Sequence, residues 1–377
     1  MPSTAERYAH RATGMAFFVT GAVFASFAAR VPAVQGRLDL SHGTLALAFL
    51  ALNAGAVAGL PAGGALATRV GSRTALRLGF ALYPVALVGA GFAPSLPVLC
   101  GVLALMAAAN SVIDVAMNVQ GVEIERRAGR PLLSRLHAAH SLGVLAGGAV
   151  GLAAAAAGVS PAIHFASVAL AATAWGLAAS GATVDDRARD DERPRTRPNR
   201  RLALLGLLAF CAFLCEGGAN DWSAVHLRSE RDAGETLAAA AFVAFSLALA
   251  AGRLAGDRAV MRLGRRRAAR AGGALAAAGL GLAAVATPVG VTIAGWALFG
   301  AGLSLLAPTI IGAAPALTSG AAAGAIAAVT TLGYLGSFTG PPLVGALAEL
   351  TSLSAALGLL VAAAATVAVL APRALPP

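Results

Sequence analysis

Residues 185–201 read DDRARDDERPRTRPNRR, the one long polar stretch in an otherwise apolar chain of 377 residues. Its prolines and mixed charges predict a solvated linker rather than a packed element. On each side of it lie about six apolar segments of the ~17 to 25 residues that a membrane span requires. We therefore expect an all-α integral membrane protein of twelve transmembrane helices, with pseudo-symmetric six-helix bundles at 1–181 and 202–377 and a cytoplasmic linker at 182–201. The expected spans are residues 13–34, 43–68, 73–93, 96–121, 134–158, 161–181, 202–227, 236–256, 267–287, 289–312, 320–348 and 352–371.

The composition agrees with a membrane protein and argues against other classes. Hydrophobic residues make up 58% of the chain and charged residues 12%, whereas soluble domains are about 45 to 50% apolar. The net charge of +11 comes from arginine, because the chain has no lysine, and it raises the question of a nucleic-acid partner. Cys100, Cys211 and Cys215 lie in apolar segments without paired spacing, so we interpret them as packing residues rather than a disulfide frame or a zinc site.

The positions of the arginines predict an orientation and exclude the nucleic-acid interpretation. With the N-terminus in the cytoplasm, the cytoplasmic side holds Arg7, Arg11, Arg69, Arg73, Arg77, Arg126, Arg127, Arg130, Arg135, the seven arginines of the linker, the cluster from Arg253 to Arg270, and Arg373. The other side holds Arg30, Arg37, Arg228 and Arg231. This asymmetry follows the positive-inside rule. We expect a multi-pass protein of a bacterial plasma (inner) membrane, with both termini cytoplasmic and a basic face that attracts anionic lipid.

A glycine- and arginine-rich turn occurs once in each half. Residues 63–79 read GGALATRVGSRTALRLG and residues 252–273 read GRLAGDRAVMRLGRRRAARAGG. An internal repeat of this kind is common in transporters. The alternative interpretation is a plain turn with positive-inside arginines.

The first copy resembles the loop signature of the major facilitator superfamily in Gly64, Leu66, Arg69, Gly71 and Arg73. In that family an acid normally precedes the first arginine, whereas Thr68 stands there in this chain. The second copy keeps an acid in Asp257, beside Arg258. The resemblance implies a gate that holds the cytoplasmic side shut in the outward-facing state, formed by Gly64, Arg69, Gly71, Arg73, Asp257 and Arg258.

Three acids lie inside expected spans, namely Asp114, Glu216 and Asp221. An ionised carboxylate at membrane depth costs about 2.5 to 3.5 kcal/mol on insertion scales, so it normally faces a cavity or a partner. Desolvation raises the pKa of a carboxyl group, and a nearby cation lowers it. A carboxyl group subject to both effects can bind and release a proton near neutral pH. For Asp114 and Glu216 we weigh proton coupling against a purely structural pair.

Residues 110–143 place an acid and two histidines in one helical hairpin. Asp114 and Asn118 share a helical face, as do His137 and His140, and two antiparallel helices would hold them at similar depth. Asp114 can therefore meet either histidine. A metal site is disfavoured, because Asp114 is the only evident third ligand.

This pattern resembles the fucose permease branch of the superfamily, and with residues 333–345, GYLGSFTGPPLVG, the YbjJ type of inner-membrane facilitators within it. The resemblance implies proton coupling at Asp114 and substrate contact at Asn118, His137 and His140. Those permeases carry a second acid in the first helix, but residues 13–34 contain none. We infer that Glu216 replaces it.

The seventh expected span ends in the polar run EGGANDWSAVHLR at residues 216–228. Its paired glycines favour a bend that exposes carbonyl groups to a ligand. Trp222 can stack on a sugar or anchor the helix at the interface. We expect Arg30 to pair with Glu216 or Asp221, and we place Arg30, Asn220, Asp221 and Trp222 among the substrate contacts.

These observations predict a secondary active transporter that moves a small polar, sugar-like solute across the inner membrane by proton-coupled alternating access. Its partners are the solute, protons and membrane lipid, and we expect a monomer without cofactor or nucleic acid. One alternative is a proton-driven exporter of drugs or amphipathic metabolites. Others are a membrane sensor or scaffold and an intramembrane enzyme using Asp114 and His140 as a dyad.

Overall fold

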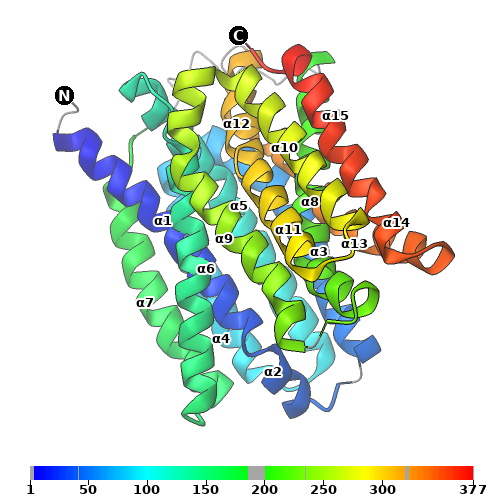
Figure 1. Ribbon diagram of the computed structural model, residues 1–377. Helices are drawn as coiled ribbons and strands as arrows, with labels where there is room; N and C mark the ends of the chain where they lie inside the picture. Colours follow the sequence, from blue (N-terminus) through cyan, green and yellow to red (C-terminus); the bar gives the residue numbers. More distant parts are fainter. Residues whose placement is uncertain (1–3, 41, 186–199, 234, 319–321, 377) are drawn as a thin grey trace. The chain divides into compact units, whose positions relative to one another are not determined.

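The computed structural model describes residues 4–40, 42–185, 200–233, 235–318 and 322–376. This part of the chain is helical, and twelve of its helical segments are long and apolar enough to cross a membrane. The prediction of an all-α protein (Figure 1) with twelve spans is confirmed. Most of the expected linker, residues 186–199, lies outside the described residues.

The chain divides into two compact units, which we describe separately. The first comprises residues 1–129 and 136–195, and the second comprises residues 130–135 and 196–377. Helices of the first unit are α1 (Thr4–Ala28), α2 (Val31–Arg37), α3 (His42–Val70), α4 (Ser72–Phe92), α5 (Leu96–Ala128), α6 (Leu133–Ala156, whose first three residues group with the second unit) and α7 (Pro161–Gly181). Those of the second unit are α8 (Arg200–Glu230), α9 (Glu235–Leu263), α10 (Arg265–Val285), α11 (Val289–Leu303), α12 (Leu306–Ala313), the 3-10 helix η1 (Ala314–Leu317), α13 (Ala322–Leu350), α14 (Leu353–Ala356) and α15 (Gly358–Ala374).

Two expected spans are interrupted in the structure. The span expected at 13–34 ends at Ala28, and Pro32 occupies the first turn of α2, where its missing N–H costs no hydrogen bond. The tenth span breaks between α11 and α12 and ends in η1, with Pro315 in the first turn of η1. Proline therefore marks interruptions in both units, whereas α13 runs without a break past Pro341 and Pro342.

The two turns singled out in the sequence have the same construction. A single glycine joins α3 to α4 and another joins α9 to α10, namely Gly71 (φ 83°, ψ 151°) and Gly264 (φ 76°, ψ 159°). This region of backbone space is accessible essentially to glycine alone. The helices before these glycines both have 29 residues, and the helices after them both have 21. The repeat inferred from sequence thus extends to helix length and joint geometry.

An arginine caps the C-terminal end of α4, and another caps the C-terminal end of α10. Arg37 donates to the carbonyl oxygens of Ala90 and Ala93 at 3.2 and 2.7 Å. Arg231 donates to those of Ala283, Ala284 and Ala286 at 3.4, 2.8 and 2.7 Å. The last carbonyls of a helix lack intrahelical partners and carry partial negative charge, so a cation there is stabilising. Two of the four arginines assigned to the outer side therefore have a structural role.

Small residues bring helices into backbone contact in each unit. In α6, a Cβ on Gly143 or Gly147 would overlap the carbonyl oxygen of Phe18 or Ala22 in α1. In α13, a Cβ on Gly336 would likewise overlap the Phe210 carbonyl oxygen in α8. Helix pairs in membranes use such glycines to approach closely, because lipid gives no hydrophobic drive for association.

A pair of neighbouring glycines in α6 tests this packing. We expect Gly147→Ala to destabilise the protein by about 1 to 3 kcal/mol, because the new methyl group meets the α1 backbone. Gly148 has nothing within 4 Å of the equivalent position, so Gly148→Ala should be neutral or stabilising by up to about 1 kcal/mol. Thermal unfolding of both variants in the same detergent measures the difference. Equal midpoints would contradict the packing described for α1 and α6.

Candidate functional site

Asp114 and Asn118 pair with each other on α5. The Asn118 side-chain amide donates to Asp114 Oδ1 at 3.2 Å and to the Asp114 backbone carbonyl at 2.8 Å. Asn118 is fully buried, and its Oδ1 has no hydrogen-bond partner among the described residues. The contact considered from sequence between Asp114 and His137 or His140 is therefore replaced by a bond to the neutral amide one turn along the same helix.

Both histidines of α6 instead contact α1. His140 Nδ1 lies 3.2 Å from Thr20 Oγ1 and 3.2 Å from the Phe17 carbonyl oxygen. The His137 ring meets the Phe17 ring edge-on, with 5.1 Å between centroids. Sequence reasoning missed Thr20, because a threonine in an apolar helix commonly bonds its own backbone and so gives little signal.

Glu216 of α8 forms an ion pair with Arg253 of α9. Arg253 Nη2 lies 3.0 Å from both carboxylate oxygens, and the arginine side chain is 7% exposed against 27% for the glutamate. Arg30, which we expected to pair with Glu216 or Asp221, donates to the Val159 carbonyl oxygen at 2.6 Å inside the first unit. The sequence analysis places Arg253 among the cytoplasmic arginines. Its position inside the expected span 236–256 nevertheless predicts an ion-pair partner, because a charge within a span is normally paired.

The remaining residues of the polar run in α8 differ in exposure. Asn220 and Asp221 are exposed, and Trp222 is partly buried. A Cβ on Gly345 of α13 would lie 3.1 Å from the Trp222 ring, so the indole packs against that glycine. This packing is compatible with both roles considered for Trp222.

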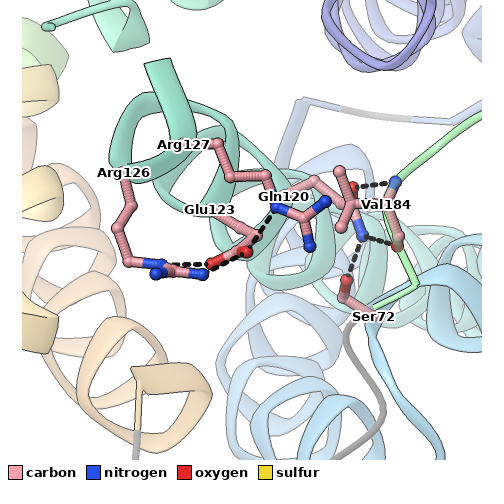
Figure 2. Close-up of polar contacts among 6 residues, drawn as sticks. All are labelled: Ser72, Gln120, Glu123, Arg126, Arg127 and Val184. Atoms are coloured by element: carbon pink, nitrogen blue, oxygen red, sulfur yellow. Dashed lines mark hydrogen bonds and ion pairs between the residues drawn. The ribbon is translucent and has the colours of Figure 1, made fainter. Parts of the chain in front are cut away.

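Gln120 of α5 forms hydrogen bonds with Ser72, next to the turn glycine Gly71, and with Val184, in the segment that follows α7 (Figure 2). Its amide nitrogen donates to Ser72 Oγ and to the Val184 carbonyl oxygen, each at 2.7 Å, and its oxygen accepts from Val184 N at 2.8 Å. Arg73 donates to the carbonyl oxygen of Thr183 and lies 3.9 Å from Asp185. The side-chain amide of Gln120 thus pairs with both the backbone N–H and the backbone C=O of Val184, as a neighbouring backbone segment would. Val184 is buried, so these groups need such a partner.

The expected gate residues separate into buried and exposed positions. Gly64 and Gly71 are buried, Arg69 and Arg258 are exposed, and Arg73 binds the Thr183 carbonyl as described. The equivalent of Arg73, two residues after the second turn glycine, is Arg266, which donates to the Leu375 carbonyl oxygen at 2.8 Å. In each unit this arginine therefore holds the chain just beyond the last helix.

Asp257 is nearly fully buried in the second unit, which includes residues 130–135. It accepts a hydrogen bond from Ser134 N at 3.0 Å and lies 3.3 Å from Arg135 Nε, so it places negative charge at the N-terminus of α6, where it is stabilising. Counted back from the turn glycines, Asp257 corresponds to Gly64, whereas Thr68 corresponds to Met261. The acid of the second copy therefore stands one helical turn away from the place that Thr68 occupies.

A substitution at Gln120 tests the tie to Val184. Gln120→Leu leaves the buried N–H and C=O of Val184 without partners, so we expect a loss of roughly 2 to 4 kcal/mol and faster hydrogen exchange at the Val184 amide. Glu123→Gln, one turn along the same helix, removes the ion pairs at 2.7 Å to Arg126 and Arg127 that Figure 2 shows. These arginines are 71% and 43% exposed, so the loss should be less than about 1 kcal/mol. Unchanged exchange at Val184 in the Gln120 variant would contradict the tie.

Comparison with known proteins adds to this geometry. A model described as the Major Facilitator Superfamily matches residues 205–377. The chain is 31% identical over 347 residues to an uncharacterized MFS-type transporter of Yersinia pestis, covering 92% of this chain and 90% of the relative. It is 32% identical over 367 residues to the uncharacterized transporter y4wD of Sinorhizobium fredii (96% and 97%), and 29% identical over 364 residues to the membrane protein MosC of Rhizobium meliloti (95% and 88%).

Solved structures share the fold at low identity. The transporter FucP in an outward conformation superposes with a TM-score of 0.82 at 15% identity, covering 98% of this chain and 99% of that one. The proton:xylose symporter XylE superposes with a TM-score of 0.72 at 14% identity, covering 100% and 97%.

Proposed function

Because the chain belongs to the major facilitator superfamily of secondary transporters, we propose that it moves a small polar, sugar-like solute across a bacterial inner membrane by proton-coupled alternating access. Members of this family are transporters and not enzymes, which removes the dyad of Asp114 and His140 from consideration. The proposed topology places both termini in the cytoplasm, as the arginine asymmetry favours.

The observation that carries the proposed coupling is the bond between Asp114 and Asn118. Its partner is a neutral amide, so protonation of Asp114 removes a charge from the membrane interior without breaking an ion pair. Protonation of Glu216 breaks the ion pair with Arg253 and is therefore more costly. This difference supports Asp114 as the first proton site and Glu216 as the second.

We assign Asn118, His137, His140, Arg30, Asn220, Asp221 and Trp222 to the solute. The fucose:proton and proton:xylose symporters among the solved structures of this fold support a sugar-like solute and a proton. We assign the cytoplasmic gate to Gly64, Arg69, Gly71, Arg73, Asp257 and Arg258, with Asp257 as its buried charge.

Proton movement in proteoliposomes tests the role of Asp114. With the wild-type protein we expect a hydroxylated solute supplied on one side to alkalinise that compartment as it enters the vesicle with protons. Asp114→Asn should abolish this signal, because an amide cannot take up the proton. Glu123→Gln, at a partly exposed position of the same helix, serves as the control. Proton movement that is unchanged in Asp114→Asn would remove Asp114 from the coupling step, and solute efflux driven by inward protons would indicate the exporter instead.

A charge exchange tests the ion pair of the second unit. Glu216→Arg and Arg253→Glu should each abolish transport, since each leaves two like charges together in the membrane interior. The double variant restores opposite charges and should recover part of the flux, in the manner of a double-mutant cycle. Arg228→Glu, at an exposed position of α8, is the matched control and should retain transport. Absence of any recovery would contradict the importance of the pair.

A further inference from the structure

One face of α10 changes from cationic to apolar along the helix. Arg267 and Arg270, three residues apart and so on the same side, are both exposed near its N-terminal end. The apolar part of this face is long enough, at a rise of about 1.5 Å per residue, to cover the ~15 Å depth of one membrane leaflet. Its exposed residues follow at helical spacing and are Ala271, Ala274, Leu275, Ala278, Leu282 and Val285.

α15 brings a third arginine to the cationic end of this face. The two helices are antiparallel neighbours in the second unit (Figure 1). Arg266 of α10 donates to the Leu375 carbonyl oxygen at the end of α15, and a Cβ on Gly273 would meet the backbone of Ala368. Arg373 is exposed and lies between these two contacts along α15, just as the exposed arginines of α10 lie between them along α10.

The first unit shows how close two of these side chains start. Arg270 corresponds to Arg77, because each is six residues after its turn glycine. Arg373 corresponds to Gly181, because each is two residues before the carbonyl that accepts from the anchoring arginine. A Cβ on Gly181 would lie 3.9 Å from Arg77 Nη2. The second unit therefore directs two cations to a place where the first unit holds one.

The chain supplies these cations with little negative charge. Arg267, Arg270 and Arg373 form no hydrogen bond or ion pair within the part of the chain that the structure describes. Neither α10 nor α15 contains an acidic residue. On α9, Asp257 is buried and is already bonded to Ser134 N. Like charges gathered in this way repel one another, so an anion bound among them is stabilising.

We propose that Arg267, Arg270 and Arg373 form a binding site for one anionic phospholipid, with the phosphate headgroup among the arginines and an acyl chain along the apolar face of α10. Guanidinium groups form paired, charge-assisted hydrogen bonds with phosphate. Basic sites between membrane helices favour anionic headgroups. The apolar residues continue directly from the arginines, which fits an amphiphile better than a free phosphate ion.

This site is more specific than the general attraction of a basic face for anionic lipid. It belongs to the second unit alone, because the places of Arg267 and Arg373 are taken in the first unit by Thr74 and Gly181. A lipid held by arginines of both helices also links α10 to α15. The inference is independent of the transported solute and of the coupling ion.

Native mass spectrometry of the full-length protein in detergent tests the site. We expect one dioleoyl-phosphatidylglycerol to bind at least about tenfold more tightly than dioleoyl-phosphatidylcholine, which has the same chains and no net charge. Arg270→Gln combined with Arg373→Gln should remove this preference. Arg11→Gln combined with Arg77→Gln removes equal charge from exposed positions of the first unit and should leave it unchanged.

A preference that falls equally in both double variants would indicate only general attraction and overturn the proposal. Equal binding of the two lipids by the wild-type protein would overturn it without reference to any variant.

The melting midpoint identifies the occupant. Phosphatidylglycerol should raise the midpoint of the wild-type protein, and this rise should be absent in Arg270→Gln with Arg373→Gln. Inorganic phosphate and glycerol phosphate, which lack acyl chains, should neither raise the midpoint nor displace the lipid at equal concentration. Displacement by either of them would indicate a phosphate site without a lipid requirement and contradict the assigned occupant.

Discussion

Backbone carbonyl groups at the end of a helix have no intrahelical hydrogen-bond partners and must find other donors. In this protein arginine provides such donors at four places. Arg37 and Arg231 cap the far ends of α4 and α10, and Arg73 and Arg266 hold the chain beyond α7 and α15. Arg231 occupies in the second unit the place that Arg37 has in the first, and Arg266 the place that Arg73 has. The same kinds of contact therefore fix these helix ends in both units. The side chains that can differ between the units lie between these fixed ends.

The acids of the two units differ in how they are neutralised. Asp114 faces an amide on its own helix, and Glu216 faces a buried arginine on the neighbouring helix. Asp114 can gain a proton without loss of an ion pair, whereas the ion pair with Arg253 favours the charged form of Glu216. This division gives a chain without an acid in residues 13–34 two acids of different chemical character inside its expected spans.

Hydropathy and arginine placement were sufficient to predict the helical class, the twelve spans and the repeat, because a membrane imposes length and composition on each span. They could not locate the end of α1 at Ala28, because α2 begins as a separate helix at Val31 with Pro32 in its first turn. Nor could they assign Glu216 to Arg253, because the choice among arginines depends on which helices are neighbours. Thr20 and Gln120 were missed for a related reason: an isolated polar residue in an apolar segment does not reveal whether its partner is local or distant. The spacing of Asp114 and Asn118 was informative because the two residues share one helical face.

The matched lengths of α3 with α9 and of α4 with α10, each pair joined by one glycine, point to the origin of the chain. Duplication of a half-size ancestor accounts for two copies of such a joint together with two copies of the arginine anchors.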